Sequence, residues 1–368
     1  MTRTHVAIIG AGLAGLHAAY RLHRAGIDFI LLEARNRLGG RILSVDESGA
    51  PSDDGFDLGP SWYWPRVQPA IADLITELGL ASFPQNGNGD VLVERMSREG
   101  PQRFRGDSQE PVSFRLAGGT ASLVRALARK IPAERVLPGG QVTELTMLDD
   151  GVVVTVMRSE DGPTETIAAA HVIACLPPRL LATHVRFSPA LDAVTLHRWR
   201  ETPTWMASHA KFIASYDRAF WRDGGLSGTA QSMVGPMPEM HDASTAAGAP
   251  AIFGFLGVSA DQRAALGRAA ITQACVAQLV RLFGPDASTP RATLFMDWAA
   301  EPFTATMADR RAGGHPAPHT APWVIGEWQD RLTLGGSEAS VIESGYLAGA
   351  IVASTQAVAD VLQRPVQR

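Results

Sequence analysis

The chain has 368 residues, 45% of them hydrophobic, so it is large enough for two domains or one large one and is not globally disordered. Its formal net charge is −4, and its basic residues form no single run or face, which argues against a nucleic-acid partner. Cys175 and Cys275 are far apart and show neither metal-binding nor redox spacing, so no metal site is expected.

The first apolar stretch, HVAIIGAGLAGLHAAY, indicates folded structure, because it has neither a cationic leader nor a cleavage site. Residues 5–9 predict a short strand, GAGLAG predicts a tight turn, and an amphipathic helix follows through Arg24. DFILLEA predicts a second strand, which completes a βαβ unit of about 30 residues. No run of about 18 apolar residues occurs, so we expect no membrane span and a cytoplasmic location.

The turn of this unit has the glycine spacing of a dinucleotide-binding fingerprint. Gly10 allows a tight turn, Gly12 lets the backbone approach a pyrophosphate, and Gly15 lets the helix pack closely on the strand. The helix N-terminus offers unpaired N–H groups to the phosphates. Glu33, at the end of the second strand, can accept both hydroxyls of an adenosine ribose. A glycine-rich turn without a ligand is the alternative, and the βαβ context favours dinucleotide binding.

The rest of the chain predicts a mixture of helices, strands and loops, as in an α/β protein, without an internal repeat. Periodicity and turn residues predict helices at 68–80, 120–131, 269–284 and 346–364, a hairpin at 142–157, strands at 171–176, 208–216, 251–258 and 331–338, a loop or weak hairpin at 84–111, and loops at 235–250 and 309–322.

Lysine is rare in this chain, which is otherwise rich in arginine, alanine and glycine, a composition that suggests a bacterial source. Only two of its 33 basic residues are lysines. Lys130 ends a helix whose face reads as solvated, whereas Lys211 lies in SHAKFIASYDRAFWR, an apolar and strand-like run. Arginine fills exposed basic positions elsewhere, so a lysine here indicates a role for a compact ammonium group.

Motifs along nearly the whole chain resemble the flavin-containing amine oxidase family, the monoamine and polyamine oxidases and their relatives. They are LLEARNRLGGRILSV, DLGPSWYWP, FRLAGGTASLVRAL, VIACLPP, HAKFIASYDRAFWR, the DW pair at 297–298 and LTLGGSEASVIESGYLAGA. The resemblance implies an FAD cofactor and a two-domain α/β fold. It implies a Rossmann-type FAD-binding domain made of residues 1–66, 115–200 and 306–368, and a smaller mixed-sheet substrate domain made of residues 67–114 and 201–305.

The resemblance also implies the cofactor contacts. Arg41 would neutralise pyrophosphate charge, with a surface ion pair as the alternative, and the two glycines before it would let the loop wrap the cofactor. Val142 matches the position whose backbone meets the adenine, and the turn at 336–338 matches one near the ribityl and phosphate groups. The implied cofactor-binding residues are Gly10, Gly12, Leu13, Ala14, Gly15, Glu33, Ala34, Arg35, Gly39, Gly40, Arg41, Gly59, Pro60, Ser61, Trp62, Val142, Gly336, Ser337, Glu338 and Leu347.

Three residues are implied to take part in the reaction. In the family a lysine in the strand before FW reaches a water that is hydrogen-bonded to flavin N5, and Lys211 matches it; a positive charge there favours the reduced flavin. Tyr346 matches an aromatic residue that stands over the flavin face, and Trp298 would be a wall near the lysine. The alternatives are a lysine that snorkels from a strand edge and aromatic residues of the core.

The chain departs from the family after Trp298. Some members attach the flavin through a cysteine in this region, but AAEPFTATMADRR contains none, so we expect non-covalent FAD. The region also lacks the second tyrosine of the aromatic cage of monoamine oxidases, and Phe303, Trp323, Trp62 or Trp64 are candidates to replace it. Only about 50 residues separate GPSWYWP from FRLAGG, where larger relatives insert a helical segment. We therefore expect an open site for a bulky or carrier-bound substrate, or a site completed by a second subunit of a homodimer.

The implied reaction is the oxidation of an amine at its C–N bond. A hydride equivalent passes from the α-carbon to flavin N5, and the imine is hydrolysed in water. Molecular oxygen or another carrier would be the electron acceptor. Two alternatives stay open. One is a flavin-dependent desaturase that oxidises C–C bonds of a larger apolar substrate, as phytoene desaturases and protoporphyrinogen oxidases do, and the other is a non-catalytic FAD-bound scaffold.

Overall fold

The computed structural model describes residues 2–96, 98–106, 110–158, 162–311 and 314–364, so parts of the predicted loops at 84–111 and 309–322 lie outside the described residues. The chain forms two compact units, one made of Met1–Arg41, Leu123–Ala207 and Pro302–Arg368, the other of Ile42–Ser122 and Ser208–Glu301. Each mixes helices and strands, as an α/β fold requires. Across the described residues, no helix has the length and apolar character needed to cross a membrane.

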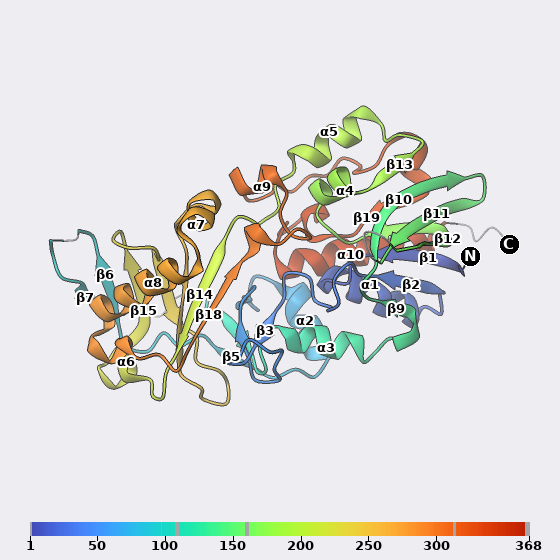
Figure 1. Cartoon of the computed structure of the whole chain (residues 1–368). Helices are drawn as coiled ribbons and strands as arrows, with labels where there is room; N and C mark the ends of the chain where they lie inside the picture. The colour runs from blue at the N-terminus through green and yellow to red at the C-terminus, as the bar shows by residue number, and fades with distance from the viewer. Residues whose placement is uncertain (1, 97, 107–109, 159–161, 312–313, 365–368) are drawn as a thin grey trace. The chain divides into compact units, whose positions relative to one another are not determined.

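The first unit is built on one mixed sheet with helices packed beside it (Figure 1). Its strands are β1 (Thr2–Ile9), β2 (Phe29–Leu32), β9 (Val136–Leu137), β10 (Gln141–Leu148), β11 (Gly151–Met157), β12 (Thr164–Ala174), β13 (Arg186–Ser188) and β19 (Leu332–Leu334). Its α-helices are α1 (Leu13–Arg24), α3 (Ala121–Ala128, which begins in the second unit), α4 (Pro178–His184), α5 (Ala193–Glu201), α9 (Met307–Arg311) and α10 (Leu347–Leu362), and its 3-10 helices are η1 (Ala133–Arg135), η4 (Gly326–Asp330) and η5 (Ser337–Ala339).

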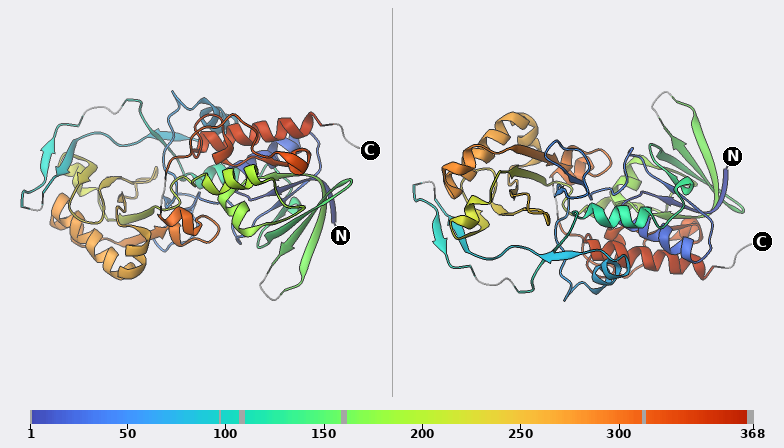
Figure 2. Two further views of the ribbon diagram at one scale, coloured as in Figure 1. Left: turned by 90° about the horizontal axis from the view of Figure 1, so that it is seen from above. Right: turned by 90° about the horizontal axis from the view of Figure 1, so that it is seen from below.

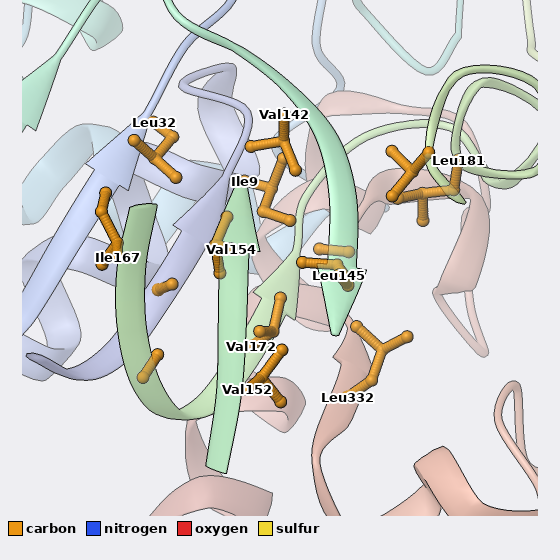
Figure 3. Close-up of a cluster of buried hydrophobic side chains, with 14 of the residues drawn as sticks. Ile9, Leu32, Val142, Leu145, Val152, Val154, Ile167, Val172, Leu181 and Leu332 are labelled. Carbon is orange, nitrogen blue, oxygen red and sulfur yellow. The ribbon is translucent and has the colours of Figure 1, made fainter. Parts of the chain in front are cut away.

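The strand order of this sheet is β13-β10-β11-β12-β1-β2-β9, and β19 also pairs with β12. β1 is parallel to β2 on one side and to β12 on the other, and α1 connects β1 to β2, so the predicted βαβ unit is confirmed. β10 and β11 form the predicted antiparallel hairpin. Branched apolar residues of these strands, among them Ile9, Val142, Leu145, Val154 and Val172, form the core gathered around β10, β11 and β12 in Figure 3.

Helices α1 and α10 lie side by side in the first unit (Figures 1 and 2). His17 of α1 is buried, and its Nδ1 lies 2.8 Å from Ser354 Oγ of α10, so a polar side chain at a buried helix position has a partner. The last turn of α1 carries Arg21, His23 and Arg24, whose positive charge complements the helix dipole at that end.

The second unit contains a larger sheet and two short two-stranded ones. The order of the larger sheet is β18-β14-β17-β16-β15-β6-β7, while β3 pairs with β4 and β5 with β8. The strands are β3 (Ser44–Val45), β4 (Phe56–Asp57), β5 (Ser82–Pro84), β6 (Asp90–Glu94), β7 (Gln102–Phe104), β8 (Phe114–Leu116), β14 (Ala210–Ser215), β15 (Leu226–Ser232), β16 (Glu239–Asp242), β17 (Ala251–Phe255) and β18 (Ala292–Asp297). The helices are α2 (Pro69–Glu77), α6 (Phe220–Asp223), α7 (Ala260–Leu266), α8 (Arg268–Phe283), η2 (Pro285–Ser288) and η3 (Trp298–Ala300).

β14 lies inside this larger sheet, antiparallel to both β17 and β18, and all six of its residues are buried. Phe212 of β14 packs in one cluster with Cys275 and Leu279 of α8, so this helix covers one face of the sheet. Ile213 of the same strand belongs to a second buried apolar cluster together with Phe253, so apolar side chains cover both faces of β14.

One strand of this sheet contradicts the sequence prediction. Residues 235–250 were predicted as a loop, but β16 runs through them between β15 and β17. The strand reads as polar, and it can be buried because the Asp242 carboxylate accepts from Trp221 Nε1 at 2.8 Å and from Arg222 Nε at 2.7 Å. These partners come from α6, which no local pattern connects to residue 242.

The compact units also differ from the predicted domain boundaries. Residues 42–66 and 115–122 were predicted to belong to the FAD-binding domain, and they lie in the second unit. The reason is that the segment from Asp57 to Ser61 is hydrogen-bonded to Lys211 of β14, as described below. The assignment of one domain to the cofactor and the other to the substrate stays a prediction.

Candidate functional site

The turn between β1 and α1 is tightly packed at two of its three glycines. Gly10 has a φ of +94°, and a Cβ there would lie 2.9 Å from the carbonyl oxygen of Cys175. A Cβ at Gly15 would lie 1.8 Å from the carbonyl oxygen of Gly10. Any side chain at Gly15 would therefore force α1 away from the turn.

Gly12 is different, because the packing of the protein does not require a glycine there. The nearest atoms to a Cβ at Gly12 would be the Gly39 oxygen and Gly40 Cα, both at 3.9 Å, an ordinary van der Waals distance. Gly12 is also the N-cap of α1, has no side chain to cap the helix, and is followed by a first turn without acidic residues. An uncapped helix N-terminus beside space that a Cβ would fill fits the pyrophosphate of a dinucleotide.

Glu33 is buried, and both of its carboxylate oxygens are held in place. Oε2 accepts from the Ala11 N–H at 2.8 Å, and Oε1 accepts from the Arg35 N–H at 2.9 Å. The Gly39 N–H donates to the Ala11 carbonyl at 2.8 Å, so the predicted glycine pair packs against the turn. Each Glu33 oxygen keeps a second lone pair, which fits acceptance from a ribose hydroxyl.

The predicted adenine position lies next to Glu33. The Gly140 N–H donates to the Glu33 carbonyl at 2.9 Å, and Val142 follows at the start of β10. β10 pairs with β11 through Val142 and Val156, and its register shifts immediately after this pair. A register shift leaves backbone groups outside the regular ladder, which suits recognition of a base by backbone atoms.

Arg41 is engaged by the protein itself. Its guanidinium donates to Glu338 Oε1 at 2.8 Å and to Ser337 Oγ at 3.2 Å, and Glu338 is almost fully buried. The pair links the turn after β2 to η5, two segments that the sequence predicted as cofactor-binding. Arg41 is thus in an ion pair with a buried partner, so the predicted neutralisation of pyrophosphate by Arg41 stays a prediction and the alternative of an ion pair stays open.

Three aromatic rings of the first unit lie together. Tyr346 is the N-cap residue of α10, and its ring centroid lies 5.0 Å from that of His315 and 6.1 Å from that of Trp205. Trp205 and His315 are themselves 4.4 Å apart at an interplanar angle of 67°. Tyr346 and Trp205 are half-buried and His315 is exposed, so the cluster is not part of the apolar core. We call these three residues the aromatic cluster.

The backbone on both sides of the aromatic cluster is strained and firmly held. Met206, next to Trp205, and Glu343, three residues before Tyr346, are the two non-glycine residues with positive φ among the described ranges, at 61° and 52°. The Trp205 carbonyl accepts from Arg41 at 3.0 Å. Strain of this kind persists where the surroundings enforce it, and it concentrates at functional sites.

The aromatic cluster was not predicted in this form. Among the candidates for a second cage residue, Phe303 lies under the Arg35 guanidinium, and Trp323 packs against the core of the first unit. The partners of Tyr346 in this unit are instead Trp205 and His315, which lie in loops without periodicity. A tryptophan in a polar loop was the one signal in the sequence that could have pointed to Trp205.

In the second unit, Lys211 is buried and not a snorkelling lysine. Its side chain is 2% exposed, and Nζ donates to the Asp57 carbonyl at 2.8 Å, the Gly59 carbonyl at 3.0 Å and Ser61 Oγ at 2.7 Å. Nζ also lies 4.1 Å from the centre of the Phe253 ring. Cation–π attraction and three hydrogen bonds offset the loss of hydration of the ammonium.

Burial lowers the pKa of Lys211 to about 7. The negative charge of Asp57 opposes this shift, and the positive charge of Arg115 adds to it. The neutral amine would keep two N–H donors and gain a lone pair that can accept from the Ser61 hydroxyl, so all three contacts are compatible with either protonation state. A group that titrates near neutral pH in a buried, polar setting is a candidate for a functional residue.

The other predicted residues of the second unit lie around the same loop. Trp298 is buried, and its Nε1 donates to the Leu58 carbonyl at 3.0 Å. Trp62 is half-buried, its Nε1 donates to Gln85 Oε1 at 2.8 Å, and its ring lies 5.3 Å from that of Phe253. The structure therefore brings Lys211, Trp298 and the predicted segment 59–62 together.

The fold and sequence match known flavoproteins. The sequence model of the family described as "Flavin containing amine oxidoreductase" matches residues 13–116 and 95–362. The chain is 24% identical over 94% of both chains to the probable flavin-containing monoamine oxidase A of Dictyostelium discoideum, and 22% identical, over 94% of this chain and 92% of the relative, to an L-amino acid dehydrogenase of Synechocystis sp..

Solved structures have the same fold. Wild-type putrescine oxidase bound to putrescine superposes with a TM-score of 0.77 at 20% identity, covering 98% of this chain and 99% of the other. Cyclohexylamine oxidase from Brevibacterium oxydans IH-35A superposes with a TM-score of 0.78 at 20% identity, covering 98% of this chain and all of the other. The predicted two-domain α/β fold is thereby confirmed.

Substitution of Gly12 and Gly15 should separate binding from folding. Gly15→Ala places a methyl group against the Gly10 carbonyl, so we expect a loss of about 1–3 kcal/mol in the free energy of unfolding. Gly12→Ala meets no protein atom closely, so the protein free of flavin should unfold as the wild type does, while FAD binding weakens at least tenfold. Urea unfolding and flavin titration measure the two effects. Equal destabilisation by both substitutions would contradict the assignment of the Gly12 space to a ligand.

Lys211 should make stability depend on pH. Between its folded-state pKa of about 7 and its unfolded-state pKa of about 10.4, the unfolded chain binds a proton that the folded chain does not, so the contribution of this group to stability rises with pH. We expect the free energy of unfolding of the wild type, relative to that of Lys211→Met, to rise by on the order of 1–2 kcal/mol between pH 7 and pH 9. Urea unfolding of both proteins at the two pH values, with saturating FAD, tests this. A difference that stays constant or falls with pH would show that Lys211 keeps an ordinary pKa.

Proposed function

This chain belongs to the family of flavin-containing amine oxidoreductases, and from that premise we propose that it binds FAD non-covalently and oxidises an amine at its C–N bond. The observation that carries the proposal is the space beside Gly12 at the uncapped N-terminus of α1, with the fixed carboxylate of Glu33 next to it. The relatives and structural neighbours are named as amine oxidases and an amino acid dehydrogenase, and the reaction common to these names is the oxidation of an amine.

The residues of the first unit would hold the nucleotide. The N–H groups at the start of α1 would bind the pyrophosphate, Glu33 would accept from the adenosine ribose, and the backbone near Val142 would meet the adenine. Bound FAD would supply the oxidising chemistry by taking up a hydride equivalent from the amine α-carbon, and water would hydrolyse the released imine.

The absence of a covalent flavin link is supported by the positions of the cysteines. Residues 299–311 contain no cysteine, and Cys175 and Cys275 are both buried, in the first unit at the end of β12 and in the second unit within α8. The pKa of Cys275 is raised to about 12 by burial, so it is an unreactive thiol. Acid precipitation should therefore release all flavin into the supernatant.

The aromatic cluster supports recognition of an amine. The faces of the Trp and Tyr rings attract an ammonium group, and all three rings can pack against the carbon skeleton next to it. The cluster contains no acidic side chain, so it would favour an amine with an apolar or aryl substituent that lies on the rings. The role of Tyr346 over the flavin face is part of this proposal and rests on the family resemblance, which also implies that Lys211 acts near flavin N5.

Anaerobic addition of amines should bleach the yellow flavin of the purified protein. We expect at least one class of monoamine or diamine to reduce it, and stopped-flow absorbance at the flavin band measures the rate. Air admitted afterwards distinguishes an oxidase, whose flavin recolours quickly, from a dehydrogenase, whose flavin recolours slowly. The Synechocystis relative is named a dehydrogenase. A yellow protein that no amine bleaches would exclude amine oxidation and favour a C–C desaturase or a scaffold.

His315 should contribute to substrate binding. His315→Ala removes one ring of the aromatic cluster from an exposed position, so folding should be unaffected while KM for the reactive amine rises about two- to tenfold, as expected for about 0.5–1.5 kcal/mol of ring contact. His319→Ala is the matched control, because His319 lies in the same loop and its ring faces Trp323. An equal KM in the two variants would remove His315 from the substrate site.

A further inference from the structure

The segment from Asp57 to Ser61 has an unusual set of hydrogen bonds. Each of its five consecutive residues presents an acceptor within hydrogen-bonding distance of a donor on a buried side chain. Lys211 Nζ donates to the Asp57 carbonyl, the Gly59 carbonyl and Ser61 Oγ, and Trp298 Nε1 donates to the Leu58 carbonyl. We call residues 57–61 the clamped loop.

The donor to the fifth acceptor, the Pro60 carbonyl, is Thr120, which lies in the FRLAGGTASLVRAL motif but was not among the predicted site residues. Thr120 Oγ1 lies 2.9 Å from this carbonyl and 2.9 Å from Asp57 Oδ1, so its single O–H is shared between two acceptors of the clamped loop. The donors therefore come from three places in the second unit: β14, η3 and the residue before α3. Lys211, Trp298 and Thr120 are 2%, 5% and 2% exposed, so water cannot readily replace a lost donor.

Thr120 is itself held in place from the start of the clamped loop. Its N–H donates to Asp57 Oδ1 at 2.8 Å, and Ser44 Oγ donates to the same oxygen at 2.6 Å. The Ala121 N–H donates to Ser44 Oγ at 3.0 Å and links Ser44 back to the residue after Thr120. Gly119, with a φ of +69°, has no room for a side chain, because a Cβ there would lie 2.5 Å from Ser44 Oγ. The Thr120 hydroxyl is thus positioned by the carboxylate of the same loop that it supports.

Lys211 uses all of its donors within this network. An ammonium group has three N–H bonds, and the clamped loop accepts all three. The rings of Phe253 at 4.1 Å and Phe255 at 5.6 Å flank Nζ and offer no further acceptor. In this arrangement Lys211 can influence bound flavin through the backbone that it holds and has no N–H left for a further acceptor.

We propose that Lys211, Trp298 and Thr120 act together as positioning residues, which fix the clamped loop in the conformation that the flavin reaction needs, and that Thr120 belongs to this functional set. The inference rests on the proposed function, because residues 59–62 are the predicted cofactor contacts of the second unit. If Lys211 acts directly at the flavin, loss of the Thr120 hydroxyl should not change the rate of the reaction. If Lys211 acts through the clamped loop, loss of either residue should slow the reaction for the same reason.

The test compares FAD-loaded variants in anaerobic stopped-flow reduction by the amine that bleaches the wild type. Thr120→Val keeps the shape of the side chain and removes the hydroxyl, so we expect reduction at saturating amine to slow about tenfold or more. Thr120→Ser restores the hydroxyl and should restore the rate. Lys211→Met should also be slow, and the double variant should be no slower than Lys211→Met alone, because residues that act as a unit are not additive.

Thr76→Val is the matched control, because it removes the hydroxyl of an exposed threonine in α2 of the same unit and should leave the rate unchanged. If Thr120→Val does not fold, Trp298→Phe decides, since it removes only the N–H donated to Leu58 and keeps an aromatic ring. Reduction at the wild-type rate by Thr120→Val, or by Trp298→Phe in its place, while Lys211→Met is slow, would overturn the proposal and assign a direct role to Lys211.

The flavin absorption band and the FAD dissociation constant give a second readout that needs no substrate. Loosening of the clamped loop should shift the band or weaken FAD binding in Thr120→Val and Trp298→Phe, but not in Thr76→Val. If no amine reduces the wild type and these shifts still occur, the proposed function fails and the positioning role stands. If amines reduce the wild type and the variants match it in rate, band and affinity, the positioning role fails and the proposed function stands.

Discussion

The architecture of the first unit depends on the close approach of α1 to the turn that follows β1. A Cβ at Gly15 would lie 1.8 Å from the Gly10 carbonyl, so the helix can start there only because no side chain intervenes. With the helix N-terminus in this place, the Ala11 N–H reaches Glu33, and the Gly39 N–H reaches the Ala11 carbonyl. The space at Gly12 follows from the same packing and is the part that the protein leaves unfilled.

The structure of the second unit depends on the burial of the Lys211 amino group. An ammonium group away from water is unfavourable unless acceptors surround it, and the clamped loop supplies three. Arginine could not replace Lys211 in this place, because a planar guanidinium has a longer reach and a fork geometry that does not converge on two carbonyls and one hydroxyl. This accounts for a lysine in a chain that uses arginine at nearly all other basic positions.

The two groups of residues have different relations to a ligand. The packing of the protein does not require a glycine at position 12, and the ligand proposed for this place would account for it. The residues of the clamped loop have partners in the protein itself, so their arrangement exists before any ligand binds. If the clamped loop contacts the cofactor as proposed, it would lose less conformational freedom on binding, which is the advantage of preorganisation.

Much of the local structure could be predicted because it depends on neighbours in the chain. The βαβ unit, the hairpin of β10 and β11 and the terminal helix followed from periodicity and turn residues, with α10 observed at Leu347–Leu362. β16 could not be predicted, because its polar residues are buried only with partners from α6. The predicted domain boundaries differed from the compact units for a similar reason, since residues 57–61 are bound to a strand far along the chain.

The sequence by itself determined the family, the cofactor class and the residues of the glycine turn, because short motifs carry that chemistry in contiguous residues. Only the tertiary structure decided what those residues contact. Lys211 and Asp57 are 154 positions apart, and Arg41 and Glu338 are 297 apart, yet each pair is in hydrogen-bonding contact. It also placed Trp205 and His315 against Tyr346 and Thr120 beneath Pro60. Such contacts are set by how sheets and loops pack across the chain, and no local pattern of residues encodes that packing.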